Sequence, residues 1–231
     1  MNGVTFGEKH SFEDFGLILS SKSISPPEPQ TKLVTVPLRD GTIDLTESLT
    51  NDVKYNDRML SMSFSVIDQV NMWPKKISAI ENFLHGRRMK IIFDDDCAFY
   101  YIGRLKVNNF ESDKSIGKIA IEGTVDPYKY DVVSSNDDWL WDPFDFDDGI
   151  INAYGNISVS GSEVVSLIGR RKKVCPMITV SKDMTVTFEG NAYNLKTGTN
   201  KIYEILISEG ENTLTFTGTG TVSIDYTGGS L

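Results

Sequence analysis

The sequence predicts a mainly β fold in two domains: a β-sandwich-like domain with one α-helix, followed by a smaller β-sandwich. Three observations lead to this prediction. From Leu33 onward, apolar residues alternate with polar ones in short runs separated by turn residues, the pattern of half-buried antiparallel strands. A single stretch, residues 73–86, has helical periodicity instead. Near residue 140 the 231-residue chain passes through an acidic, aromatic stretch without periodicity, which separates two sets of strands.

The first domain is predicted to cover residues 1–133. Within it, WPKKISAIENFLHG predicts one helix, because Pro74 suits a first turn and the apolar residues that follow share one face. Gly86 is expected to end this helix, since glycine readily adopts the left-handed conformation found at helix C-termini. The strands are expected at the runs LVTVP, TIDL, MLSMSFSVI, MKIIF, FYYIGRLKV and KIAIEGTV.

Residues 134–149 are predicted to connect the two domains. This stretch, SSNDDWLWDPFDFDDG, combines Asp with Trp and Phe and contains no Lys or Arg, so we expect its rings to pack and its carboxylates to face water. The second domain is predicted to cover residues 150–231 as a β-sandwich with turns at EGEN and GTGT. Its strands are expected at NISVSG, PMITV, MTVTFEG, KIYEILI, NTLTFTG and TVSIDYTG.

Composition narrows the classes of function. A formal net charge of -9 opposes phosphate backbones, so nucleic-acid binding is not expected as the main task. The N-terminus lacks the basic and apolar regions of a secretory signal, and no run approaches the roughly 20 apolar residues of a membrane span. We therefore expect assembly in a cytoplasm without membrane insertion. Cys97 and Cys175 are expected to be free thiols, because two distant cysteines do not make a disulfide framework.

No set of residues predicts catalysis, a metal site or another cofactor. His10 and His85 stand apart from any nucleophile motif or zinc-ligand spacing, so surface or packing roles are expected. Asp94, Asp95 and Asp96 in FDDDCAF could offer oxygen ligands to a cation. The spacing of a calcium-binding loop is absent, so a solvated turn is favoured.

Four further segments have both a functional and a structural interpretation. The basic run GRRKK at 169–173 could dock on an acidic partner, although a solvated loop is favoured. Trp139 and Trp141 could stack on sugar rings, although packing between domains is favoured. Asp142 and Asp145 resemble a glycosidase carboxylate pair only in sequence proximity, which does not define an active site. GTGTVSIDYTGG lacks the Gly-Lys-Ser/Thr of a phosphate-binding loop and is expected to be a hairpin turn.

The motif LRDG, Leu38 to Gly41, lies between the predicted strands LVTVP and TIDL. Asp and Gly favour tight turns, because Asp hydrogen-bonds to nearby backbone and Gly accepts positive φ. The flanking alternation therefore predicts a β-hairpin with LRDG at its tip, in preference to a catalytic carboxylate with its arginine or to an adhesion motif.

Several segments, taken in order, resemble the distal tail protein (Dit) family of siphophages. They are MNGVTFGEKHSFEDFGLIL, PPEPQTKLVTVP followed by RDGTIDLTESL, YNDRMLSMSF, FLHGRRMKIIFDDD and YYIGRL, and together they span most of residues 1–133. The C-terminal segment GENTLTFTGTGTVSIDY is similar to the small galectin-like or carbohydrate-module-like sandwich that many of these proteins carry.

The resemblance implies a structural protein of the virion tail tip rather than an enzyme. The first domain would form a hexameric ring that meets the tail tube protein on one face and the tail-associated lysin or baseplate hub on the other, with DNA passing through the lumen. The second domain would project outward, where it could support receptor-binding proteins. The alternative is a carbohydrate-binding adhesin that contacts the host cell wall through the second domain.

The resemblance also places the LRDG hairpin against the adjacent subunit, so Leu38, Arg39, Asp40 and Gly41 are predicted interface residues. One residue departs from the family pattern. The family has Gly where this chain has Leu38, and Leu does not freely adopt the backbone angles that Gly allows. Either the turn has another shape, or Leu38 fills a contact on a neighbour.

Overall fold

The computed structural model describes residues 3–66, 73–113, 116–133 and 154–231, and most of these residues lie in β-strands. The chain divides into two compact units. Unit 1 comprises residues 1–95 and 101–127 together with Leu231, and unit 2 comprises residues 96–100 and 128–230. The predicted mainly β fold class is confirmed.

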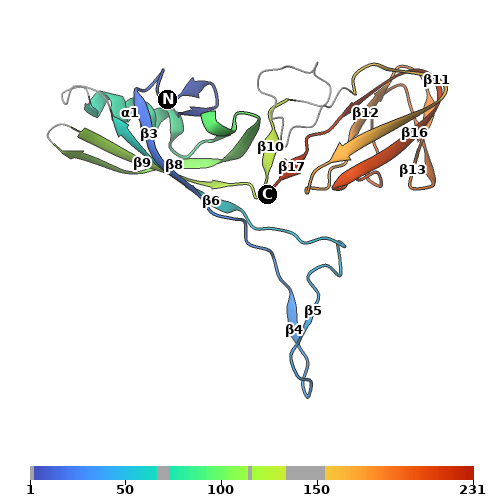
Figure 1. Ribbon diagram of the computed structural model, residues 1–231, viewed down its shortest axis with the longest axis horizontal. Helices are drawn as coiled ribbons and strands as arrows, with labels where there is room; N and C mark the ends of the chain where they lie inside the picture. The colour runs from blue at the N-terminus through green and yellow to red at the C-terminus, as the bar shows by residue number, and fades with distance from the viewer. Residues whose placement is uncertain (1–2, 67–72, 114–115, 134–153) are drawn as a thin grey trace. The chain divides into compact units, whose positions relative to one another are not determined.

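One face of the unit 1 sheet is covered by the helix α1 (Trp73–Leu84), as Figure 1 shows. The sheet has the strand order β2-β1-β7-β8-β9-β6-β3. The three-residue 3-10 helix η2 (Asp94–Asp96) follows β7. The strands are β1 (Val4–Phe6), β2 (Lys9–His10), β3 (Leu17–Ile24), β6 (Arg58–Val66), β7 (Arg88–Phe93), β8 (Phe99–Asp113) and β9 (Ile116–Val125), and a separate two-stranded sheet joins β4 (Leu33–Thr35) to β5 (Thr42–Asp44).

The core of unit 1 follows from alternation along the strands. In β6 every second residue from Arg58 to Val66 is buried, so the strand presents one face to the core and one to solvent. The helix adds the buried side chains of Trp73, Ile80 and Leu84 to the same cluster. Each fully buried large apolar side chain contributes about 1.5–3 kcal/mol relative to exposure. The predicted helix is therefore confirmed, and Gly86, with φ +76°, follows its end as expected.

Unit 2 is built on a 6-stranded sheet of order β14-β13-β16-β12-β15, with β11 paired to β16. Two short strands, β10 and β17, pair with each other, and β10 also pairs with the first two residues of β8. The strands of the unit are β10 (Lys129–Asp131), β11 (Ile157–Gly169), β12 (Met177–Val180), β13 (Met184–Phe188), β14 (Asn191–Leu195), β15 (Gly198–Lys201), β16 (Gly210–Asp225) and β17 (Gly229–Ser230).

The strand β16 changes partners halfway along its length. Its first half pairs with β13 at Leu214–Thr217, and its second half pairs with β12 at Val222–Asp225. Between the halves, Gly218 and Gly220 have φ of 151° and 155°, and a Cβ on Gly218 would lie 2.7 Å from the Cβ of Met184. Glycine is therefore required where the bent strand passes the 181–184 turn. Both halves contribute to one buried cluster.

Two sequence-based predictions for unit 2 were wrong. GTGT is not a turn, because residues 218–221 lie inside β16, and their glycines serve the bend and the close approach rather than a chain reversal. KIYEILI is not a strand beyond Lys201, although Ile205 and Ile207 are buried. The amide of Ile205 donates to the carbonyl of Ile202 in a turn, so the alternation there reflects burial of turn residues.

Candidate functional site

The most unusual surface of unit 1 is the arm, defined here as residues 25–57, which leaves the sheet between β3 and β6 (Figure 1). Its β4–β5 hairpin is short, with the pairs Leu33↔Asp44, Val34↔Ile43 and Thr35↔Thr42. No apolar side chain of the arm is buried. A two-stranded hairpin without a core is at best marginally stable in water, so its folded shape depends on local hydrogen bonds or on a partner.

The LRDG motif lies at the tip of this hairpin. The amide of Arg39 donates to the carbonyl of Val36 at 3.3 Å, which closes a turn with Pro37 and Leu38 at its centre. Leu38 has a φ of 65°, and Gly41, two residues beyond Arg39, has a φ of 74°. Proline followed by a residue of positive φ is the pattern of a type II turn, in which Gly or Asn is usual.

Leu38 thus adopts the conformation that the Gly of the family pattern would allow. For a residue with a Cβ, that conformation costs roughly 1–2 kcal/mol. The side chain is also fully exposed. Within the described chain, therefore, nothing stabilises the side chain in compensation for the strained backbone.

Local hydrogen bonds support the base of the hairpin. Asp44 accepts bonds from the backbone amide of Thr46 at 2.9 Å and from the Thr46 hydroxyl. The hydroxyl bond, followed by the amide bond, holds the pKa of Asp44 below its ordinary value. The amide of Lys32 donates to Thr46 Oγ1 at 3.0 Å, which joins the two sides of the hairpin.

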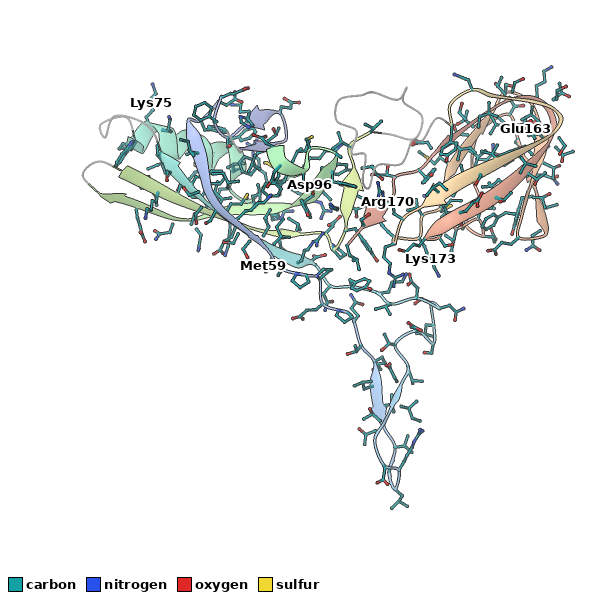
Figure 2. All side chains as sticks on the ribbon, viewed as in Figure 1. Met59, Lys75, Asp96, Glu163, Arg170 and Lys173 are labelled. Atoms are coloured by element: carbon teal, nitrogen blue, oxygen red, sulfur yellow. The ribbon has the colours of Figure 1, made fainter. Side chains whose placement is uncertain are left out.

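Exposed large apolar residues of unit 1 concentrate on the arm and at its base. A monomeric protein rarely gathers such residues without a binding role, whereas scattered single residues need no explanation. Beyond the tip, the set comprises Leu33, Leu45 and Leu49 on the arm and Met59 at the start of β6, which Figure 2 labels.

Arg58, beside the base of the arm, is a buried cation. Its side chain is 6 % exposed, and the Nε and Nη2 atoms have no hydrogen-bond partner within the described part of the chain. The guanidinium carbon lies 4.9 Å from the centroid of the Tyr101 ring, a cation–π arrangement. Burial lowers the pKa of Arg58 from its ordinary value.

A second candidate surface is a cleft of about 460 Å³ within unit 2. Three lysines and three tyrosines contribute to its lining, opposed by Asp225. The rings of Tyr100 and Tyr130 lie 5.5 Å apart at 32°, and Lys172 Nζ donates to the Tyr130 hydroxyl at 3.1 Å. The three tyrosines of the lining are Tyr100, Tyr130 and Tyr226, and the three lysines are Lys172, Lys173 and Lys201. Aromatic rings beside ammonium groups suit a ring-shaped ligand that carries negative charge.

The basic run GRRKK forms part of this region. Arg170 makes a bidentate ion pair with Asp131, with Nε 2.8 Å and Nη2 2.6 Å from the two carboxylate oxygens. Both side chains are largely buried. The run is therefore more than a solvated loop, because one of its arginines joins the 169–173 segment to β10 inside unit 2.

The three acids of FDDDCAF lie in η2 and are each committed to a separate basic partner. Asp94 accepts from the Gly3 amide at 2.6 Å and lies 3.3 Å from His10 Nε2. Asp95 pairs with Lys22, and Asp96 pairs with Lys129 at 3.1 Å. Such pairs join distant segments of chain. Among the described residues, no group of three or more His, Cys, Asp or Glu side chains is arranged to hold a metal ion.

Two cysteines differ in their surroundings. Cys97 is exposed, whereas Cys175 is partly buried and lines the unit 2 cleft. Burial raises the pKa of the Cys175 thiol. His85 accepts a hydrogen bond from the Val107 amide at 3.2 Å, a packing role.

Several predicted features lie outside the described residues. They are the connector 134–149, the possible sugar-stacking residues Trp139 and Trp141, and the acids Asp142 and Asp145. Within the described chain, no helix has the length and apolar character needed to cross a membrane.

Comparison with known proteins gives one informative result. No family model matches the sequence, and no curated protein matches it. A solved structure does match: SPP1 Dit (gp 19.1), described as a paradigm of the hub adsorption apparatus in phages that infect Gram-positive hosts, superposes with a TM-score of 0.66. The match covers 98% of this chain and 99% of that one at 14% sequence identity. The chain has the Dit fold.

The Dit fold accounts for the order of the two units, since the likeness runs over nearly the full length of both chains. At this level of identity individual residues are not transferable from one protein to the other, so the arm and the unit 2 cleft stand on their own geometry. The resemblance of residues 1–133 to the Dit family depended on several motifs that are individually unspecific but occur in the family's order. The structure supports this resemblance at the level of the fold.

Proposed function

We propose that this chain is a structural hub of a siphophage tail tip, located in the virion, which forms a hexameric ring between the tail tube and the tail-associated lysin or baseplate. The observation that carries the proposal is the full-length likeness to SPP1 Dit, a protein of a hub adsorption apparatus. The role is non-enzymatic. The lumen of the ring would pass DNA, and the acidic net charge of the chain suits a wall along which DNA slides without binding.

The arm tip is proposed as a subunit contact. Arg39 and Asp40 are both exposed and can form charge-assisted hydrogen bonds across an interface, each contributing only about 1 kcal/mol while partly wet. Gly41 supplies a turn conformation that a side chain would strain. The repetition of these contacts around a closed ring would make them significant for assembly.

The charge swap Arg39→Glu with Asp40→Lys tests this proposal. Because both side chains are exposed, the variant should melt within about 0.5 kcal/mol of wild type. Light scattering should show wild type as a hexamer and the variant as a smaller species at the same concentration. The matched control is Lys32→Glu with Glu47→Lys, a swap at exposed arm positions away from the tip. A wild-type protein that is monomeric at every concentration would refute the ring, and an intact hexamer in the swap at low and high salt would refute the role of the tip charges.

A carbohydrate-binding adhesin is the second candidate, and the unit 2 cleft favours it. Lysines and tyrosines converge on a cleft of about 460 Å³ in a chain of net charge -9. This local reversal of charge suits an acidic saccharide, with sugar rings against Tyr and acid groups against Lys. Trp139 and Trp141 stay candidates for stacking.

A glycan array of acidic and neutral saccharides, probed with the full chain, separates the two functions. An adhesin should bind acidic glycans, and Lys173→Glu with Lys201→Glu should abolish the signal. Lys196→Glu is the matched control, because Lys196 is an exposed lysine of the same unit outside the cleft. An array without signal for wild type would exclude the adhesin and leave the hub.

A further inference from the structure

A groove crosses the unit 1 sheet at the base of the arm. The strand register aligns four residues directly across β7, β8, β9 and β6: Arg88↔Arg104, Arg104↔Thr124 and Thr124↔Met59. Directly opposed residues of antiparallel strands project from the same face, so these side chains form one transverse row. They line a cleft of about 420 Å³ together with Lys106 and other residues.

The two ends of the groove differ in chemistry. At one end Met59, 49 % exposed, lies with its sulfur 3.8 Å from Thr124 Oγ1. Asp57, exposed and two residues before Met59 in the chain, adds a negative charge at this end.

The other end of the groove is basic. Arg88 is paired with Asp126 at 2.7 Å, Lys106 is paired with Glu122 at 3.1 Å, and Arg104 donates to the Gly86 carbonyl. All three cations are more exposed than buried. An incoming carboxylate at this end would meet the Arg104 guanidinium, which donates to a neutral carbonyl.

The arm tip matches this arrangement residue by residue. Leu38 is a fully exposed apolar side chain, suited to the Met59 end. Asp40 carries the charge that the Arg104 end lacks, and Arg39 carries the charge that complements Asp57. The tip and the groove are therefore complementary in both signs of charge and in apolar surface.

The arm begins beside the groove and carries its tip away from the groove of the same copy. Ser25, where the arm begins, is fastened to Met59: its amide donates to the Met59 carbonyl at 3.0 Å, and its Oγ accepts from the Met59 amide at 3.0 Å. Figure 1 shows the hairpin pointing away from the strands of the sheet. In this arrangement the tip does not lie in the groove of its own copy, so the groove is open to the tip of another copy.

We propose that the groove lined by Met59, Thr124, Arg88 and Arg104 receives the arm tip, Leu38 to Asp40, of a second copy of this chain. The inference rests on the proposed ring and goes beyond it by naming the receiving surface. A tip and a groove on different faces give a head-to-tail contact, which closes into a ring when the rotation between copies permits. Docking of Leu38 would also account for its strained backbone, because burial of the side chain offsets that cost in the assembly.

Disulfide trapping tests the contact directly. Leu38→Cys and Met59→Cys are made separately in a full-length Cys97→Ser background, which removes the exposed native thiol. The two proteins are mixed and oxidised, and crosslinked dimer is measured on a non-reducing gel. The matched control replaces Leu38→Cys with Leu49→Cys, since Leu49 is another almost fully exposed leucine of the arm that lies away from the tip.

The expected result is crosslinked dimer from the Leu38 and Met59 pair, at several times the yield of the Leu49 and Met59 pair. Equal yields, or no dimer from the first pair, overturn the groove. Light scattering of wild type reports on the proposed ring independently. A hexamer that fails to crosslink would refute the groove contact and leave the ring standing. A monomer that fails to crosslink would refute both proposals.

A second measurement uses Leu38→Gly. Glycine accepts a φ of 65° without strain, so this variant should fold with a melting temperature no lower than that of wild type while it loses the docking side chain. Assembly should weaken about tenfold or more, the effect expected from deleting an apolar anchor at an interface. Unchanged assembly in a stable Leu38→Gly protein would overturn the role of Leu38 as the anchor.

Discussion

Two antiparallel strand pairs of the molecule, the β4–β5 hairpin in the arm and the β11–β16 pair in unit 2, are stabilised in opposite ways. The β11–β16 ladder runs from Ile157↔Val222 to Gly169↔Gly210, and its inward residues join a buried cluster. The β4–β5 ladder ends after the pair Thr35↔Thr42 and buries no apolar side chain. The β11–β16 pair is held by the core of its own unit, whereas the β4–β5 hairpin lacks any core contact within the described residues.

The two strand pairs also differ in which residues adopt positive φ. Gly161 faces Gly218 across the β11–β16 ladder, and both have positive φ, so the bend is made by residues without a Cβ. The arm makes its tip turn with Leu38 at φ 65°. Within the described residues no burial of the Leu38 side chain offsets this strain, and the proposed docking on a second copy would supply it.

The largest expected effect comes from the strand pair that is packed against a core. Phe216, on β16, is fully buried. Phe216→Ala should lower the free energy of unfolding by about 3–5 kcal/mol, because transfer and cavity terms add. Leu38→Ala on the arm should change it by less than about 0.5 kcal/mol, as for other exposed positions. Urea titration of both variants measures the contrast, and a Phe216→Ala cost below about 1 kcal/mol would contradict a core-supported β11–β16 pair.

Glycine replacements separate backbone strain from crowding. Gly41→Ala and Gly218→Ala both place a Cβ at positive φ, but nothing lies within 4 Å of the new Cβ at Gly41, whereas Met184 Cβ lies 2.7 Å from it at Gly218. We expect a cost of about 1 kcal/mol at Gly41 from strain alone and about 2–4 kcal/mol at Gly218, where the neighbouring turn must also move. Thermal melts of the two variants give the difference, and equal costs would show that crowding at Gly218 is relieved freely.

Leu38→Gly tests the backbone strain at the arm tip by removing it. Removing the strain of a positive φ should raise the free energy of unfolding by about 1–2 kcal/mol. The larger conformational entropy of glycine in the unfolded chain should lower it by about 0.5–1 kcal/mol. The net change in the free energy of unfolding should lie between zero and about +1 kcal/mol. A dilute, monomeric sample isolates this term, and a clear destabilisation there would mean that the Leu38 side chain is packed within its own subunit.

Much of the fold was predictable because the strands obey simple periodicity. The alternation of β6 and the helical stretch ending before Gly86 both mark real elements, since each has one face in the core of unit 1. The tip of the arm was predictable as well, because Asp and Gly between two alternating runs indicate a hairpin. These features depend on neighbours close in sequence.

Features that depend on distant partners were not predictable. The 202–207 segment alternates like a strand, yet its isoleucines are buried from turns. The glycines of GTGT could be assigned to a bend only once Met184 and Ser181 were known to lie against them. The acids of η2 gave no hint that their partners are His10, Lys22 and Lys129, which come from three other segments. The unit 1 groove arises from register across four strands, which no local pattern encodes.

Each region contains an exposed aspartate held by hydrogen bonds from a threonine, and the smallest predicted effect concerns these two. Asp183 in unit 2 accepts from Lys196 Nζ at 2.9 Å and from the amide and hydroxyl of Thr197, and these bonds lower its pKa to about 2. The pKa of Asp44 in the arm is also lowered, by hydrogen bonds from Thr46 alone.

Because the folded pKa of Asp183 lies below the unfolded value of 3.8, its stabilisation is fully present above about pH 4 and is lost as the pH falls through about 2. Asp183→Asn should therefore melt lower than wild type near pH 7, and the gap should close toward pH 2. Added salt should narrow the gap at neutral pH, since Lys196 is largely exposed. Asp44→Asn should show the same trend only if the arm hairpin unfolds together with unit 1. A difference in melting temperature between Asp44→Asn and wild type that does not change with pH, measured beside a clear Asp183 effect, would mean that the hairpin opens on its own, as the proposed docking of the arm on another subunit predicts.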